Sequence, residues 1–262
     1  MVTPQMIKEL RERTGVGMSD CKNALVEANG DMEAAIDLLR KKGLAKAAKR
    51  AGNETNEGKI KIVVEGSKAY VAVVTCETDF VARNDTFEAM LSHFIDIRKG
   101  ESTDEAAIAK AEELKASEYT LKVGENMVIK ALTEITGDVI SAYVHSNWKN
   151  ASIVVAKSGT DTDKLKQVAM HVVAAAPQVV SPSDISDDIV AKEREIQLEI
   201  MKQDPKNAGK PDEILSKIIE GKMTKFREEN ALLTQPFVVN PDQKVGEFIG
   251  AGNVVSFVRY SI

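Results

Sequence analysis

The chain is poor in cysteine and has no long apolar run. Its two cysteines, Cys21 and Cys76, fall far apart, one in a helix-like and one in a strand-like segment. Neither a disulfide framework nor a metal-ligand spacing is therefore indicated, and a reducing compartment fits. No apolar stretch approaches the ~20 residues of a membrane span, and the N-terminus shows no apolar or arginine-rich presequence. We expect a cytoplasmic protein that is neither exported nor embedded in a membrane.

Basic residues are in the minority. The 262 residues include 35 Lys and Arg against 40 Asp and Glu, and the net charge is -5. This balance argues against a protein whose main partner is the phosphate backbone of a nucleic acid. With 43% apolar and 29% charged residues, the chain can build more than one soluble domain. An acidic surface suits a protein partner better.

The motifs of nucleotide and catalytic sites are missing too. No G-x-x-x-x-G-K-[ST] loop occurs, because Gly209-Lys210 is followed by proline, and Gly15-Val16-Gly17 lacks the third glycine of a dinucleotide turn. There is no H-E-x-x-H, C-x-x-C or G-x-S-x-G. We expect no bound nucleotide, no cofactor, no metal, and no enzyme chemistry on this chain.

The histidines give little ground for a catalytic site. His93 and His171 lie on amphipathic helical patterns, where packing against neighbours is the favoured interpretation. His145 stands at a strand end before a polar loop, and it is the one histidine that we weigh for a contact with a partner.

Residues 1–50 are predicted to form a three-helix bundle of the ubiquitin-associated type. Helix N-caps are predicted at Thr3, Ser19 and Asp31, and helix ends at Gly30 and Gly43. A bundle of some 40 residues is marginal alone, so we expect it to dock on something. Its first loop carries Val16 and Met18 on a glycine-flexed turn, where they either cap the small core or contact a partner.

A basic run, residues 41–50, ends this bundle, and residues 51–57 lack apolar periodicity and are interpreted as a linker. The basic run has two interpretations. One is RNA contact. The other, which the acidic whole favours, is a solvated helix face that the C-terminal end of the helix dipole stabilises.

From Gly58 the pattern changes to the alternation of a β-hairpin, followed by an amphipathic helix over residues 87–95. The same order returns with strands at 139–144 and 151–156 and a helix from Leu165. A polar helix at 101–116 and a strand at 127–135 lie between them. We therefore predict an α+β fold with a pseudo-duplicated β-hairpin and helix core, built on antiparallel sheets, with halves at 58–136 and 137–262.

An antiparallel helical hairpin is predicted at about 187–228, inserted into the second half. Its apolar stripe is assigned to Val190, Ile196 and Ile200 on the first helix and to Ile214, Leu215, Ile218, Ile219, Met223 and Phe226 on the second. Residues 204–211 would form its tip. The charged faces around the stripe favour an arm that projects from the core. A late strand is predicted at 254–260.

The segment Thr78-Asp79-Phe80-Val81-Ala82-Arg83 follows directly on a β-rich run, 70–76. Thr78, Asp79 and Asn84 are turn and helix-cap residues, so Phe80 is placed on a tight connection just beyond the sheet. From side-chain chemistry alone, Phe80 is expected to fold back as a core plug, because aromatic side chains usually bury most of their area.

This hexapeptide resembles the signature of the elongation factor Ts family, the guanine-nucleotide exchange factors of elongation factor Tu. Residues 10–18 running into 20–25 resemble a second signature of the family, and similarity continues to near residue 260. Val73 and Thr75 stand where the family pattern tends to have an acid and an asparagine. They change the strand before the hexapeptide and leave the hexapeptide itself intact.

The resemblance implies a partner and a mechanism. Elongation factor Tu, GDP-bound or nucleotide-free, would be gripped by the bundle and by partner-binding residues Val16, Met18, Ser19 and His145. An intruding tip would approach the Mg²⁺ and phosphate site of the partner and dislodge Mg²⁺, so that GDP leaves and GTP enters. The tip would consist of Thr78, Asp79, Phe80 and Val81. The family also has a coiled coil at the place of 187–228.

Two other functions stay open at this point. A non-catalytic, RNA-binding translation protein would use the basic run and the helical arm, and its binding would depend steeply on salt. An enzyme would use Cys76 with a histidine and would need a reactive thiolate. The sequence also leaves open whether the core forms a homodimer and whether the complex is one-to-one or two-to-two.

Overall fold

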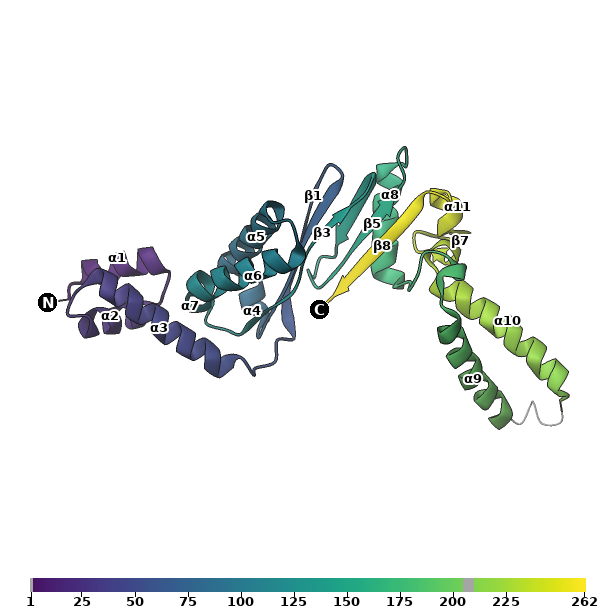
Figure 1. Cartoon of the computed structure of the whole chain (residues 1–262), viewed down its shortest axis with the longest axis horizontal. Helices are drawn as coiled ribbons and strands as arrows, with labels where there is room; N and C mark the ends of the chain where they lie inside the picture. Colours follow the sequence, from purple (N-terminus) through teal and green to yellow (C-terminus); the bar gives the residue numbers. More distant parts are fainter. Residues whose placement is uncertain (1, 205–209) are drawn as a thin grey trace. The chain divides into compact units, whose positions relative to one another are not determined.

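The computed structural model of the protein describes residues 2–204 and 210–262, which form two compact units. Unit 1 comprises the residues up to Ile135 together with Ser146–Asn150 and Tyr260–Ile262, and unit 2 comprises Thr136–His145 and Ala151–Arg259. Both combine helices with a three-stranded sheet that contains an antiparallel hairpin, which confirms the α+β class (Figure 1).

Unit 1 begins with three helices, α1 (Pro4–Thr14), α2 (Met18–Glu27) and α3 (Met32–Arg50). Two predicted caps are confirmed, because Thr3 accepts a hydrogen bond from the amide of Met6 and Asp31 accepts one from Ala34. Side chains spaced at helical intervals fill a small core, including Leu10, Cys21, Leu25 and Leu39.

Two predicted helix boundaries are wrong. α2 begins at Met18 with Gly17 as its N-cap, so Ser19 lies inside the helix. Gly43 does not end α3, which continues to Arg50. Gly43 is needed for close packing instead, because a Cβ there would lie 2.0 Å from Cδ2 of Leu121.

The sheet of unit 1 has the order β1-β2-β3, with β1 at Glu57–Glu65, β2 at Lys68–Cys76 and β3 at Met127–Thr136. β1 and β2 pair antiparallel from Glu57 opposite Cys76 to Glu65 opposite Lys68. The amphipathic helix α5 (Asp85–Gly100) packs on this sheet as predicted. The shared core consists of Tyr70, Ala72, Val74 and Cys76 with Phe87, Met90, Leu91, Phe94 and Ile95.

Between α5 and β3 the chain forms more helix than the sequence predicts. After α6 (Asp104–Leu114) a π-helical turn (Lys115–Tyr119) leads into α7 (Thr120–Val123), which Gly124 ends with a φ of 75°. Leu121 of α7 packs against the core of the three-helix bundle. The bundle therefore docks within unit 1, at the point where Gly43 lets the helices approach.

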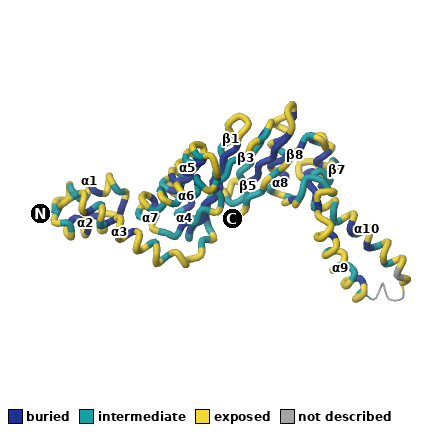
Figure 2. The backbone as a smooth tube through the Cα atoms, viewed as in Figure 1, coloured by how far each residue is buried: buried dark blue, intermediate teal, exposed yellow. Residues whose placement is uncertain are grey.

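Unit 2 repeats the arrangement with the sheet order β4-β5-β8, comprising β4 (Val139–Val144), β5 (Asn150–Ala156) and β8 (Val254–Ser261). α8 (Thr162–Ala175) packs on it with the predicted spacing. Figure 2 colours the backbone by the burial of each residue. Among the described residues the further elements are α9 (Asp187–Gln203), α10 (Asp212–Asn230), β6 (Pro236–Phe237), β7 (Asn240–Lys244), α11 (Val245–Ile249) and the 3₁₀ turns Pro182–Asp184 and Leu232–Thr234.

The predicted stripe on α9 is wrong in part. Ile196 and Ile200 are 53% and 52% exposed, whereas Met201 is buried together with Val190. A helix turns about 100° per residue, so positions 190 and 201 share a face and 196 and 200 lie well off it. Ile214 on α10 is also exposed. Of the predicted tip, 204–211, residues 205–209 lie outside the described part.

No helix in the described part of the chain is both long enough and apolar enough to cross a membrane.

Candidate protein-interaction site

Phe80 lies on α4 (Asp79–Ala82), a single helical turn between β2 and α5. Thr78 is its N-cap and accepts a hydrogen bond from the amide of Val81 at 3.4 Å. Asn84 then caps α5. Within this turn Ala82 takes the core position and is only 4% exposed, while Phe80 is 82% exposed. The expected core plug is therefore wrong, since the short helix directs Phe80 to solvent.

Asp79 stays accessible beside this aromatic side chain. Its carboxylate lies 3.4 Å from the guanidinium of Arg83, one turn along, and both side chains are largely exposed. An exposed pair of this kind contributes about 0–1 kcal/mol, so a partner can replace it at little cost. The structure thus brings Thr78, Asp79, Phe80 and Val81 together on one exposed turn.

A network of two carboxylates holds the chain just before α4. Glu125 accepts hydrogen bonds from the amides of Glu77 at 3.1 Å and Thr78 at 3.0 Å, and from the Thr78 hydroxyl at 2.6 Å. Glu77 in turn accepts from the amide of Asn126 at 2.6 Å and from Nδ2 of Asn53 at 3.0 Å. We call these five residues the carboxylate clasp.

The sequence did not indicate the clasp. Glu125 and Asn126 belong to a turn that sequence patterns identify, yet their partners lie in a distant part of the chain. No local signal connects the two. The hydrogen bond from Asn126 is the main cause that lowers the pKa of Glu77, and the bond from Asn53 adds to it.

Cys76 does not have the properties of a nucleophile. Its side chain is fully buried and its thiol donates a hydrogen bond to the carbonyl of Thr78 at 3.2 Å. Burial, and then the negative charge of Glu125, raise the pKa of Cys76 to about 12. Because the thiolate is the reactive form, the thiol is inert at neutral pH. This environment weighs against an enzyme that would use Cys76 as its nucleophile.

A hollow of about 350 Å³ lies beside α4, between that turn and the loop that joins β4 to β5. Asp79, Ala82 and Arg83 line one side and Trp148 lines the other. The carbonyl of Trp148 accepts a hydrogen bond from the amide of Ile60 at 2.8 Å, which holds the loop on β1. Exposed apolar and charged groups therefore surround a concave surface next to Phe80.

The other predicted contact residues are distributed over both units. Val16 is only 5% exposed and belongs to the bundle core, whereas Met18 is 43% exposed and Ser19 lies on the surface. His145 belongs to unit 2, where its Nδ1 lies 2.9 Å from the hydroxyl of Tyr143.

Of the remaining histidines, His171 is packed as predicted, whereas His93 lies on the surface. Nδ1 of His93 lies 2.6 Å from the hydroxyl of Tyr119. His171 is fully buried, with Nε2 2.9 Å from Oε1 of Gln235 and Nδ1 accepting from the amide of Val238.

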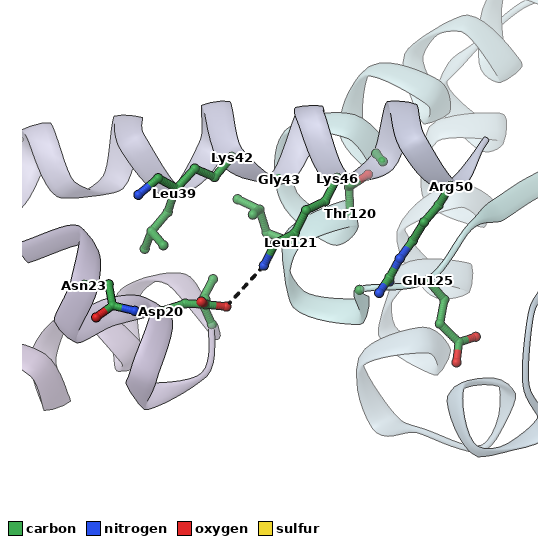
Figure 3. A pocket seen from close by; sticks show the side chains of 13 residues that line it. Asp20, Asn23, Leu39, Lys42, Gly43, Lys46, Arg50, Thr120, Leu121 and Glu125 are labelled. Atoms are coloured by element: carbon green, nitrogen blue, oxygen red, sulfur yellow. Dashed lines mark ion pairs between the residues drawn. The ribbon is translucent and has the colours of Figure 1, made fainter. Parts of the chain in front are cut away.

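The basic run forms the second half of α3 and is a solvated face. Lys42, Lys46 and Arg50 line a cavity of about 200 Å³ between this helix and α7 (Figure 3). Lys42 pairs with Glu27, and Lys46 lies 3.6 Å from a carboxylate oxygen of Asp20. These two carboxylates neutralise part of the positive charge that would bind the phosphates of RNA, so the structure weighs against the RNA hypothesis.

No group of three or more His, Cys, Asp or Glu side chains that could hold a metal ion occurs within residues 2–204 and 210–262. The site of α4 is therefore described by its shape, its exposed aromatic ring and its hydrogen bonds alone.

Comparison with known proteins shows the family of this chain. The profile of the family described as "Elongation factor TS" matches residues 77–262, which begin at the clasp residue Glu77. Elongation factor Ts of Klebsiella pneumoniae and elongation factor Ts of Salmonella typhimurium are each 42% identical to the chain over 264 residues. Each alignment covers 100% of this chain and 91% of the relative. The chain belongs to the elongation factor Ts family and is a factor of translation elongation.

Proposed function

We propose that this chain binds elongation factor Tu in its GDP-bound and nucleotide-free forms and accelerates the replacement of GDP by GTP. The observation that carries the proposal is the 82% exposure of Phe80 on a turn that the clasp holds in place. A large aromatic ring exposed to water costs solvation free energy, and it gains that back by entering an apolar site on a partner.

The proposed mechanism is displacement of Mg²⁺ rather than covalent chemistry. Tu-like GTPases hold the diphosphate with a P-loop and a Mg²⁺ ion, which is the largest positive charge in that site. Phe80 wedges between apolar groups near the metal, and Asp79 competes for polar groups there. Thr78 and Val81 keep the turn in shape. Once Mg²⁺ is displaced, the charge of the diphosphate is uncompensated and GDP dissociates quickly.

Linkage sets the direction of this cycle. If the chain binds nucleotide-free elongation factor Tu more tightly than the GDP complex, GDP must weaken the binding of the chain by the same factor. Incoming GTP then releases the chain. The cellular ratio of GTP to GDP decides which complex forms, because an exchange factor cannot shift the equilibrium.

The three-helix bundle and His145 are proposed as further contacts with elongation factor Tu. The three-helix bundle is assigned to the ubiquitin-associated type over residues 1–50, with Met18 and Ser19 exposed in the first turn of α2 and Val16 buried in the preceding loop. His145 is a further proposed contact. The linker at 51–57 and core halves at 58–136 and 137–262 complete the proposed domain division.

The hairpin of α9 and α10 is assigned as an antiparallel coiled coil. Arg227 lies 2.9 Å from Asp187, and Arg194 pairs with Glu220. Residue numbers therefore rise on α9 as they fall on α10, which is the pairing of antiparallel helices. Both helices contribute to one apolar seam.

The test is release of a fluorescent GDP analogue from the cognate elongation factor Tu in excess unlabelled GDP. We expect the chain to accelerate release by orders of magnitude, as exchange catalysis requires. Phe80→Ala should lose most of this, and Asp79→Ala a part of it. The matched control is Val64→Ala, which removes another exposed apolar side chain at the opposite end of the β1–β2 hairpin.

Binding without acceleration of release by the wild-type chain would refute the proposed exchange. Light scattering of the same complex would distinguish the one-to-one from the two-to-two stoichiometry and reveal a homodimer of the free chain. We propose the cytoplasm as its location, where translation takes place.

A further inference from the structure

The carboxylate clasp is reciprocal. The α7–β3 turn contributes Glu125, which accepts from the chain after β2, and that chain contributes Glu77, which accepts from the turn through Asn126. Hydrogen bonds to a charged acceptor are shorter and about twice as strong as neutral ones. Asn53 joins the network twice, donating to Glu77 and accepting from Nδ2 of Asn126 at 2.9 Å. The two segments are thereby joined in both directions.

The clasp acts at the residue where α4 begins. A helix of four residues does not persist through its own propensity, because nucleation is unfavourable and its first amides lack helical partners. Thr78 must keep its extended conformation, with φ at -127° and ψ at 154°, to cap this turn. Glu125 binds both the amide and the hydroxyl of Thr78, so it fixes the direction in which α4 starts.

The rest of α4 is held by packing on β1, β2 and α5 and not by hydrogen bonds from its side chains to other described residues. Ala82 is its one fully buried side chain, and Val81 is only partly packed against the core. The ion pair between Asp79 and Arg83 is exposed and contributes little orientation. The side-chain hydrogen bonds that fix where α4 starts are therefore those between Glu125 and Thr78, and they act together with this packing to place Phe80.

The carboxylate of Glu125 binds the chain before α4 and does not pair with a basic side chain of the described residues. Glu125 lines the cavity beside α3, but in Figure 3 its carboxylate is turned away from Arg50. Within the described residues its carboxylate forms no ion pair, and the hydrogen bonds that it accepts there all come from residues 77 and 78.

We propose that Glu125 is a positioning residue for nucleotide exchange, which holds Phe80 in the orientation that the partner meets. The inference rests on the proposed function. Glu125 acts through Thr78 and the start of α4, so that the turn is ordered before the partner arrives and no ordering free energy is lost on binding. Misplacement of a group by about 1 Å can lower a rate by about a hundredfold, so small shifts of Phe80 matter.

The test compares Glu125→Ala and Glu125→Gln with the wild-type chain in the GDP-release assay over a range of chain concentrations. Glu113→Gln is the matched control, because Glu113 is an exposed carboxylate of the same unit that forms no hydrogen bond or ion pair through its side chain with the described residues. We expect Glu125→Ala to lower the plateau rate on the order of tenfold, while the half-saturating concentration changes less than about threefold. Glu125→Gln, which keeps one acceptor oxygen, should retain an intermediate rate.

The plateau separates positioning from mere stability. A loss of folded protein would move the concentration dependence and leave the plateau unchanged, because the folded molecules would still act normally. An unchanged plateau in Glu125→Ala, with normal release by the wild type, would overturn the positioning role alone. No release by the wild type would overturn the proposed function and this inference with it.

Hydrogen–deuterium exchange of the free chain supplies a readout that does not depend on activity. Glu125→Ala should speed amide exchange in a peptide covering residues 77–83, while the peptide of α5 keeps its wild-type protection. If both peptides lose protection in Glu125→Ala, that variant is unfolding globally. The same two peptides of Glu125→Gln are then compared with those of the wild type, and the same criteria apply. If neither changes, Glu125 does not order the turn and the inference is wrong.

Discussion

The two units build the same sheet and helix but differ in the connection between them. In unit 1, eight residues separate Cys76 from Asp85, and α4 with its exposed Phe80 forms there. In unit 2, Ala156 is followed by a short turn in which Asp161 caps α8 directly, accepting from Asp163 and Lys164. The turn that we propose to meet the partner is therefore an insertion into a scaffold that both units share.

The cores of the two units support this division. Helix α5 presents large side chains to its sheet, with Phe87 and Phe94 at positions that Leu165 and Val172 hold in α8. All four are fully buried. Each unit therefore has its own core, and the ring on the inserted turn, Phe80, is 82% exposed, against 37% for Trp148.

The largest expected effect contrasts two phenylalanines seven positions apart. Phe87→Ala should lower the free energy of unfolding by about 3–5 kcal/mol, because it removes a fully buried ring. Phe80→Ala should change it by no more than about 0.5 kcal/mol, since Phe80 is exposed. Urea unfolding followed by circular dichroism measures both. A destabilisation of Phe80→Ala as large as that of Phe87→Ala would show that the ring is a core plug after all.

The next effect contrasts two helix-interior glycines, one in each unit. Gly43→Ala should destabilise by about 1–3 kcal/mol, because its Cβ would collide with Leu121 where α3 meets α7. Gly221→Ala in α10 should stabilise by about 0.5–1 kcal/mol, because its surroundings are open and alanine favours helix. Thermal unfolding of the two variants measures the signs. Equal signs would contradict the close packing of the bundle on α7.

Acidification should affect unit 2 before unit 1. Burial lowers the pKa of His171, and the hydrogen bond to Gln235 only partly opposes it. The neutral imidazole stabilises the fold above the ordinary His pKa of about 6.5, and this contribution is lost as the pH falls through the lower folded-state pKa. In unit 1 the lowered pKa of Glu77 becomes relevant only below the ordinary Glu value of about 4.3.

Measurements of the free energy of unfolding at pH 7.5 and 5.5 test this difference. A tenfold change in the proton affinity of His171 on folding corresponds to about 1.4 kcal/mol of stability. His171→Gln should flatten the pH dependence in that range. An equal loss of stability in the wild type and in His171→Gln would assign the effect to other groups.

The smallest expected effect concerns the exposed ion pair on α4. Arg83→Ala should change the free energy of unfolding by less than about 1 kcal/mol, because both side chains of the pair are largely exposed. Thermal unfolding in low and high salt measures it. A larger, salt-dependent loss would mean that Arg83 contributes to holding the turn, which is the task assigned to the clasp.

Periodicity predicted the parts of the fold that depend on local pattern. The predictions of the two hairpins, of α5, of α8 and of the late strand β8 were correct. In each case alternation or helical spacing of apolar residues identifies one buried face. The prediction that Gly43 ends α3 was wrong, because the sequence does not distinguish a glycine that ends a helix from one that allows close packing. The exposed state of Phe80 depends on Ala82 taking the core position in a one-turn helix, which side-chain chemistry does not predict.

The clasp could not be predicted, because Glu125 meets Thr78 only after β3 has been placed beside β2. The predicted buried face of α9 was wrong because the rotation per residue places Met201, and not Ile200, on the same side of the helix as Val190. Long-range contacts and small differences in helical phase are therefore what the structure adds.

The central claim is that the turn displaces Mg²⁺ from the partner. The most direct test measures GDP release from elongation factor Tu at saturating chain, once with Mg²⁺ and once with Mg²⁺ already removed by EDTA. The account predicts that the acceleration by the chain falls by about tenfold or more in EDTA, equivalent to about 1.4 kcal/mol or more. An acceleration that is the same in both buffers would contradict the displacement of Mg²⁺ by α4.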